Sequence, residues 1–163
     1  MAHLRNILLV LAISFAILHL SHAHGTYGEP GNTPDDYVHA HNCIRRVLGM
    51  KPLCWDDELA KVAQAWAETR APDCSLIHSD RCGENMAQGA INGSMAVQLW
   101  LDERLDYDYN ENKCIKMCGH YTQIVWANTE RVGCGRALCS NGWAYIIVCN
   151  YDPPGNVVGQ KPY

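Results

Sequence analysis

The stretch Cys118-Gly119-His120-Tyr121-Thr122-Gln123-Ile124-Val125-Trp126 decides how the rest of the chain is interpreted. From Tyr121 to Trp126, β-branched and aromatic side chains fall on both faces of an extended chain, which predicts a strand buried in the middle of a sheet. His120 stands where this strand would meet a loop. Because loops held by a rigid scaffold carry most binding and catalytic groups, we expect His120 to belong to a functional site.

The first residues have the pattern of a secretory signal peptide. A short basic start precedes an almost wholly apolar run at 7–20, and Ser21-His22-Ala23 supplies the small residues that are typical of a cleavage site. A transmembrane anchor is the alternative, but a span needs about 20 apolar residues and this run is shorter. We predict that residues 1–23 are removed and that residues 24–163 form a single secreted domain.

The composition excludes some classes of protein. All nine cysteines lie beyond the predicted signal peptide, and in a secreted chain this density predicts disulfides. The Cys-x-x-Cys pairs of zinc fingers are absent. The net charge is −4 with scattered basic residues, so we expect no nucleic-acid binding, which needs a basic stripe.

Three segments have helical patterns. Thr33-Pro34-Asp35-Asp36 is a helix start, and Gly49 would close that helix. The second helix starts at Asp56-Asp57 and ends before Pro72. The third runs from Met95 to Leu105 and is apolar on most sides, with Glu103 falling on an apolar face. Periodicity alone leaves open whether Glu103 points inward or is solvated.

Two further strands, at 132–138 and 143–149, flank Asn141-Gly142, which is a strong hairpin signal. In a two-residue turn at this dipeptide, opposed residues have numbers that sum to 283, so Cys134 faces Cys149 and we predict that they bond. Counting from that turn makes them a hydrogen-bonded pair, in which Cβ atoms are farther apart, so a bulge would have to adjust the register. The polar segment at 78–87 shows no helix or strand pattern.

Several motifs together resemble the CAP superfamily of cysteine-rich secretory, antigen 5 and pathogenesis-related proteins, and most of all plant pathogenesis-related protein 1. The resemblance covers nearly the whole secreted chain, and the order and spacing of the motifs make it specific. Besides the run from Gly119 to Trp126, they are His41-Asn42, Pro52-Leu53-x-Trp55-Asp56, Leu76-Ile77-His78-Ser79, Gly83-Glu84-Asn85, Tyr107-x-Tyr109-Asn110, Cys149-Asn150-Tyr151-Asp152-Pro153 and Gly159-Gln160-Lys161-Pro162-Tyr163.

The resemblance implies an α+β fold, namely a three-layer α-β-α sandwich with a small antiparallel sheet, stabilised by disulfides. It also implies a cleft formed by His78, Glu84, Glu103 and His120, with Glu103 pointing inward. The family pairing joins Cys74 to Cys139 and Cys114 to Cys118, beside the Cys134–Cys149 bond. Plant members carry six cysteines. Cys43, Cys54 and Cys82 are additional, and we expect a Cys43–Cys54 bond that leaves Cys82 as the free thiol or as the link in a covalent dimer.

The cleft has two interpretations. Two imidazoles and two carboxylates suit zinc or another divalent ion, although no cofactor is required. The alternative is a hydrogen-bonded cluster that rigidifies the cleft. We expect no enzyme, because no Gly-x-Ser-x-Gly elbow occurs. A secreted metal-dependent or thiol hydrolase, with Cys82 as a thiol near His78, is the runner-up.

The resemblance implies a secreted, extracellular defence protein, located in the apoplast if the source is a plant. Family members are associated with antimicrobial activity, with sterol binding by the loop that bears Tyr107, Tyr109 and Asn110, and with release of a signalling peptide by a cut between Asp152 and Pro153. We expect a monomer that binds sterol or lipid without stable insertion into a membrane; plant or pathogen proteins are further candidate partners. Ordinary packing is the alternative for the two tyrosines and for the tail. Asn92-Gly93-Ser94 is an N-glycosylation acceptor or a helix cap.

Overall fold

The computed structural model describes residues 29–163, so the predicted signal peptide lies outside the described residues. No helix in 29–163 is long and apolar enough to cross a membrane. The elements in chain order are α1 (Pro34–Val47), β1 (Cys54–Trp55), α2 (Asp57–Arg70), β2 (Glu84–Gly89), α3 (Gly93–Asp102), the 3-10 helix η1 (Glu103–Asp106), β3 (Tyr107–Asp108), β4 (Lys113–Cys114), α4 (Gly119–Ile124), β5 (Arg131–Leu138) and β6 (Tyr145–Asp152).

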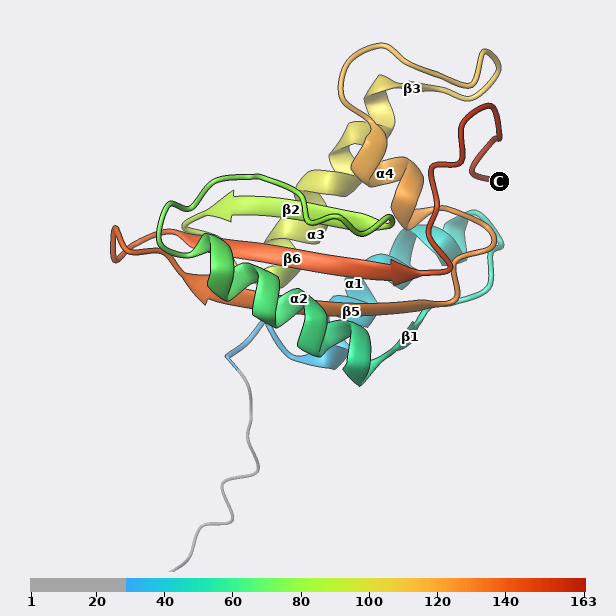
Figure 1. The fold of residues 1–163 in the computed structure, drawn as a ribbon. Helices are drawn as coiled ribbons and strands as arrows, with labels where there is room; N and C mark the ends of the chain where they lie inside the picture. The colour runs from blue at the N-terminus through green and yellow to red at the C-terminus, as the bar shows by residue number, and fades with distance from the viewer. Residues whose placement is uncertain (1–28) are drawn as a thin grey trace, which may run out of the picture.

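The main sheet is the middle layer of three (Figure 1). Its strands lie in the order β1-β5-β6-β2 and are antiparallel apart from the short pair β1–β5. α2 covers one face, where Ala63 packs with Ile146. The helices α1, α3 and α4 cover the other face, whose core includes Trp100 and Ile147. The expected α-β-α sandwich is therefore confirmed.

The first two helices begin where their capping residues predict. Thr33 Oγ1 accepts a hydrogen bond from the Asp36 N–H at 3.1 Å, and Asp36 Oδ2 accepts from the Thr33 N–H at 3.0 Å, which makes a capping box. Asp56 caps α2 by accepting from the N–H groups of Glu58 and Leu59. These bonds satisfy N–H groups that have no partner within the helix.

The third helix starts and ends earlier than predicted. Asn92 caps α3 by accepting from the Met95 N–H at 2.9 Å. The α-helix stops at Asp102, and the chain tightens into η1, which carries Glu103. The side chain of Asn92 thus acts as the cap, and its Nδ2 lies against the chain near Pro30.

The predicted strand at Tyr121–Trp126 is wrong, because this stretch contains the short helix α4. The expected burial is correct: every residue from Tyr121 to Trp126 is buried. A short apolar run has the same composition in a buried strand and in a buried helix, so pattern alone cannot separate them. The hydroxyl of Thr122 bonds back to the carbonyl of Cys118 at 3.2 Å, a local bond that suits a β-branched residue in a helix.

The end of the segment at 78–87 also differs from expectation, since Glu84–Gly89 form β2. The strand is held at the sheet edge by β6, with Asn85 opposite Cys149. Asn85 is a polar residue that is only 1% exposed. Because it takes a buried position, the sequence lacks the alternation of apolar and polar residues that would have indicated a strand. Tertiary packing here overrides the local pattern.

The hairpin register is as predicted, but its turn is longer. Cys134 lies opposite Cys149, and the Cys139 N–H donates to the Ala144 carbonyl at 2.8 Å. Four residues lie between Cys139 and Ala144, where two were predicted. The odd-numbered residues of β5 therefore take the hydrogen-bonded positions opposite β6. Cys134 and Cys149 therefore form a non-hydrogen-bonded pair with a Cα–Cα distance of 4.1 Å, and no bulge is needed.

Three disulfides are present, and they are the three pairs expected above: Cys74–Cys139, Cys114–Cys118 and Cys134–Cys149. The expected Cys43–Cys54 bond is not. Cys43, Cys54 and Cys82 are all free and exposed. Cys43 Sγ instead lies 3.6 Å from the ring Nε2 of His39 one turn earlier in α1.

Candidate functional site

Glu103 and His120 form the first of two His–Glu pairs among the four predicted cleft residues. Glu103 Oε1 lies 2.6 Å from His120 Nδ1, and Glu103 Oε2 accepts from the main-chain N–H groups of His120 at 3.0 Å and Tyr121 at 3.3 Å. The carboxylate thus holds the imidazole and also satisfies the first turn of α4, whose own N-cap makes no side-chain bond. Glu103 points inward, with 14% of its side chain exposed.

Glu84 and His78 form the second pair. The side chain of Glu84 is 1% exposed and that of His78 is 54% exposed, with 2.8 Å between Oε1 and Nδ1. Ser79 donates twice to the same carboxylate, from its N–H at 2.9 Å and from its Oγ at 2.7 Å. These three donors satisfy a carboxylate that would be costly to bury alone.

Asn85 links the two His–Glu pairs through the main chain. Asn85 follows Glu84 in β2, and its Nδ2 donates to the main-chain oxygen of His120 at 3.1 Å. The same amide lies 3.1 Å from the hydroxyl of Tyr151. The structure therefore pairs each predicted histidine with a predicted glutamate and links the two pairs, which come from three separate segments, through Asn85.

A buried polar chain continues from this link into the core. Tyr151 Oη lies 2.8 Å from His41 Nε2, and His41 Nδ1 lies 2.7 Å from the carbonyl of Tyr37. Because a carbonyl can only accept, His41 Nδ1 carries the proton and Nε2 accepts from Tyr151. Burial lowers the pKa of His41 to about 4, so it is neutral at pH 7. Sequence reasoning assigned no role to Asn85 or Tyr151, although both stand in the quoted motifs.

The orientation of the imidazoles bears on metal binding. Each Nδ1 faces a carboxylate and so donates, which leaves each Nε2 as the basic nitrogen that a divalent metal would use. The glutamates then act as residues that orient the rings, since each carboxylate already accepts from three groups. Within 29–163, no three His, Cys, Asp or Glu side chains are grouped to hold a metal by themselves.

Nucleophilic chemistry finds little support in this geometry. The hydroxyl of Ser79 is bonded to Glu84 and not to His78. Cys82 is free and exposed next to Gly83, and it makes no hydrogen bond with His78.

The predicted sterol-binding loop is tied to the C-terminal tail. Tyr109 stacks on Tyr163 with 5.0 Å between ring centroids, and its hydroxyl donates to the main-chain oxygen of Tyr163 at 2.7 Å. Lys161 Nζ lies 4.3 Å from the centre of the Tyr109 ring and 3.4 Å from the main-chain oxygen of Asn110. Figure 1 shows this end of the chain beside the β3–β4 loop.

A cavity of about 310 Å³ lies between that loop, α4 and the tail. Tyr107, Trp126 and Pro162 contribute apolar walls from the three segments. Tyr107 is held by its hydroxyl, which donates to Asn112 Oδ1 at 2.8 Å. Ile115 and Met117, on the segment between β4 and α4, are 71% and 64% exposed. Ile115 follows Cys114, which lines the cavity, and the lining also includes the polar side chains of Asn112, Thr122, Asn156 and Gln160.

Comparison with known proteins agrees with this architecture. The family model described as "CAP: Cysteine-rich secretory protein family" matches residues 38–151. Pathogenesis-related leaf protein 4 of Solanum lycopersicum is 50% identical over 162 residues, covering 97% of this chain and 96% of that protein. The basic form of pathogenesis-related protein 1 of Nicotiana tabacum is 48% identical over 156 residues, covering 93% of this chain and 84% of that protein.

A solved structure shows the same fold. Venom allergen-like protein 4 of Schistosoma mansoni superposes with a TM-score of 0.67 and 28% identity, covering 83% of this chain and 95% of that one. The sequence relatives span almost the full length, and their names describe no enzyme. The chain therefore belongs to the cysteine-rich secretory protein (CAP) family, and its relatives within that family are plant pathogenesis-related proteins of type 1.

Proposed function

We propose that this chain is a secreted, antimicrobial defence protein that acts extracellularly by capturing sterol or another flat lipid. The observation that carries this proposal is the cavity of about 310 Å³ beneath the tyrosine-bearing loop. Its volume lies at the lower end of the range of roughly 300–1,000 Å³ for small-molecule sites, so the ligand would be only partly enclosed.

The exposed apolar side chains beside the cavity support lipid as the ligand. The main chain of Ile115 lies beside the residue that follows Leu105, because the Ile115 N–H donates to the carbonyl of Asp106 at 2.7 Å. Leu105 is 78% exposed. A lipid that leaves part of its surface outside the cavity would cover these side chains. Withdrawal of sterol from a microbial membrane would then cause the antimicrobial effect.

A direct test is to titrate the secreted chain, 24–163, with a fluorescent sterol and to run a hydrolase panel in parallel. Saturable binding without turnover supports capture. Turnover of any substrate that is lost in a His120→Ala variant would favour the hydrolase alternative instead, and would place the activity in the cleft.

The cleft is the basis of a second candidate function, divalent metal binding. The free Nε2 of each imidazole favours it, because neutral imidazole nitrogen is a common ligand of zinc. His78 and His120 would hold the metal, with Glu84 and Glu103 orienting the rings. A bound metal would supply Lewis acidity at the cleft.

Release of a signalling peptide, Pro153–Tyr163, is a further proposal. Pro153 and Pro154 are exposed, so a protease can reach the bond after Asp152. The rest of the tail is bound to the domain: the Gly155 N–H donates to Gln123 Oε1 at 2.8 Å, and the Ala127 N–H donates to the Pro162 carbonyl at 2.7 Å. We therefore expect the cut to precede release, with a nicked but complete protein as an intermediate.

Mass spectrometry of extracellular fluid from challenged tissue tests this step. It should show the eleven-residue fragment together with a nicked species that keeps the fragment under native conditions. Abundant intact protein without either species would remove the proposal.

A further inference from the structure

The outer edge of β5 has a gap in its pairing. The short strand β1 covers only its beginning, where the Asp56 N–H donates to the Val132 carbonyl at 3.0 Å. In a strand, the main-chain groups of every second residue point to the same edge. Those of Cys134 and Arg136 therefore come next along this edge, beyond the reach of β1.

Gln64 of α2 supplies the hydrogen-bond partners that Arg136 lacks at this edge. Its Oε1 accepts from the Arg136 N–H at 2.9 Å, and its Nε2 donates to the Arg136 carbonyl at 3.1 Å. One side-chain amide thus pairs with Arg136 as a neighbouring strand would. No group of the described chain takes the same place at Cys134, although Cys134 is only 7% exposed.

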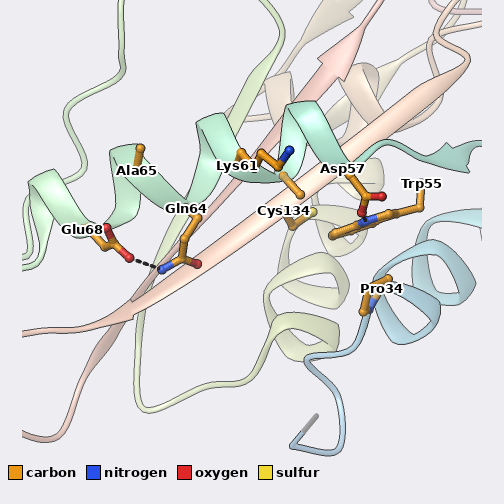
Figure 2. Close-up of a pocket in the computed structure, with 9 residues that line it drawn as sticks. Pro34, Trp55, Asp57, Lys61, Gln64, Ala65, Glu68 and Cys134 are labelled. Atoms are coloured by element: carbon orange, nitrogen blue, oxygen red, sulfur yellow. Dashed lines mark hydrogen bonds between the residues drawn. The ribbon is translucent and has the colours of Figure 1, made fainter. Parts of the chain in front are cut away.

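The gap opens into two adjoining cavities. The smaller, of about 190 Å³, is lined by Tyr37, Gln64 and Cys134 among others. The larger, of about 570 Å³, shares Gln64 and Cys134 with it and runs along α2 towards Trp55. Figure 2 shows the larger one, with the α2 side chains on one side, Pro34 of α1 on the other, and Cys134 between them.

Two residues that line the smaller cavity each have a buried polar atom that is closed off from solvent and has no hydrogen-bond partner within 29–163. These atoms are the hydroxyl of Tyr37, a residue that is 2% exposed, and Nε of Arg136. The Tyr37 hydroxyl packs against Gly93, where an added Cβ would lie 2.3 Å from it. The Gly93 N–H itself donates to Asn32, which also lines the smaller cavity. Arg136 Nη1 forms an ion pair with Glu29 at 2.6 Å. Because this carboxylate already neutralises the guanidinium, a neutral acceptor such as a carbonyl suits the remaining Nε donor.

We propose that this gap binds an extended peptide segment of another protein. One peptide unit pairs with the N–H and carbonyl of Cys134, as the Gln64 amide does with Arg136. Tyr37 Oη and Arg136 Nε are closed off in the free protein, so a neighbouring peptide carbonyl accepts from them only after these side chains turn towards the cavity. Addition of a strand to a free sheet edge is a recurring mode of peptide recognition, and the unpaired groups here are a donor and an acceptor in strand geometry.

The test uses the secreted chain with its disulfides intact and follows its amide signals by NMR. The probe is N-acetyl-trialanine N-methylamide, and the matched probe carries an N-methyl group on its central amide. We expect saturable shifts at Cys134, Gly135 and Arg136 with the first probe, in the millimolar range that one or two peptide units allow. The second probe should give none, because it has lost the donor.

A variant adds a second arm. Tyr37→Phe should weaken binding about five-fold through loss of one hydrogen bond, whereas Ser140→Ala, which removes an exposed hydroxyl from the hairpin turn, should not. Equal responses to both probes, shifts confined to other residues, or no shift at all would overturn the proposal. The comparison of probes needs no variant, so it holds whatever Tyr37→Phe does to stability.

Discussion

Arg45 offers the sharpest prediction about what holds the cleft in place. Its side chain, in α1, is fully buried and donates only to main-chain carbonyls. Nε reaches Lys51 at 2.8 Å, one Nη reaches Ile124 and Trp126 at 2.9 Å each, and the other reaches Thr129 at 3.0 Å. Two of these carbonyls lie at the C-terminal end of α4, which begins at the residue before His120.

Replacing Arg45 by Met keeps the length of the side chain but removes all four hydrogen bonds. Bonds to a charged donor contribute about 1.5–3 kcal/mol each, so four would give roughly 6–12 kcal/mol. Part of this is offset because the variant no longer buries a cation, which costs several kcal/mol. Burial lowers the pKa of Arg45 to about 10, so the cation is present at pH 7. We expect a net loss of about 4 kcal/mol in the free energy of unfolding.

Urea unfolding followed by tryptophan fluorescence measures this loss, with disulfides intact in both proteins. Arg46→Met, which changes an exposed neighbour on the same helix, is the matched control and should cost less than 0.5 kcal/mol, as surface changes typically do. Arg45→Lys should recover part of the stability, because one ammonium group can reach only some of the carbonyls. A loss below about 1 kcal/mol for Arg45→Met would refute the reasoning that these bonds anchor α4.

Three further predictions follow from other buried groups and from the cleft. Burial lowers the pKa of His41 to about 4, so between pH 6.5 and 4 this histidine is protonated in the unfolded chain and neutral in the folded one. The free energy of unfolding should therefore fall by up to ~3 kcal/mol as the pH drops from 6.5 to 4. In a His41→Gln variant, the urea midpoint should lose this dependence on pH. Gly135→Ala should lower the free energy of unfolding in urea by at least ~2 kcal/mol, because the new Cβ would lie 2.3 Å from Gln64 Cα. Gly119→Ala, whose Cβ would have its nearest neighbour at 4.0 Å, should be tolerated, and an equal loss in the two variants would contradict this prediction. Zinc should raise the melting temperature at pH 7.5, raise it less at pH 5.5 because protonated imidazole cannot bind metal, and raise it little in a folded His78→Ala, His120→Ala variant; an undiminished response in that variant would place the metal elsewhere.

The parts of the fold that sequence predicts are those with local causes. The capping box at Thr33 and the acidic start at Asp56 set the beginnings of α1 and α2 by bonds within four residues. The Asn141-Gly142 signal gives the strand register, although it does not give the turn length. There, Asn141 Oδ1 accepts from the N–H groups of Trp143 and Ala144 and so supports a four-residue loop.

The parts that sequence does not predict have distant causes. α4 is a helix because its residues from Tyr121 to Ile124 are buried and the carbonyls at its end accept from Arg45, about 80 positions earlier in the chain. Arg45 itself, in a polar segment of α1, has the sequence pattern of a surface residue. The four cleft residues were predicted from family resemblance, and only the structure shows that each glutamate faces an Nδ1 atom.

Sterol affinity of a pair of charge variants tests the central proposal most directly. Ile115→Lys with Met117→Lys places two charges beside the cavity at positions that are already exposed, so folding should be preserved. The matched control, Met95→Lys with Leu99→Lys, makes the same change on α3, where both residues are about half exposed. Burying one such side chain is worth ~1.5–3 kcal/mol, and 1.4 kcal/mol is tenfold in Kd, so the loop variant should bind fluorescent sterol at least about tenfold more weakly than the control. Equal affinity in the two folded variants would contradict lipid capture at this loop.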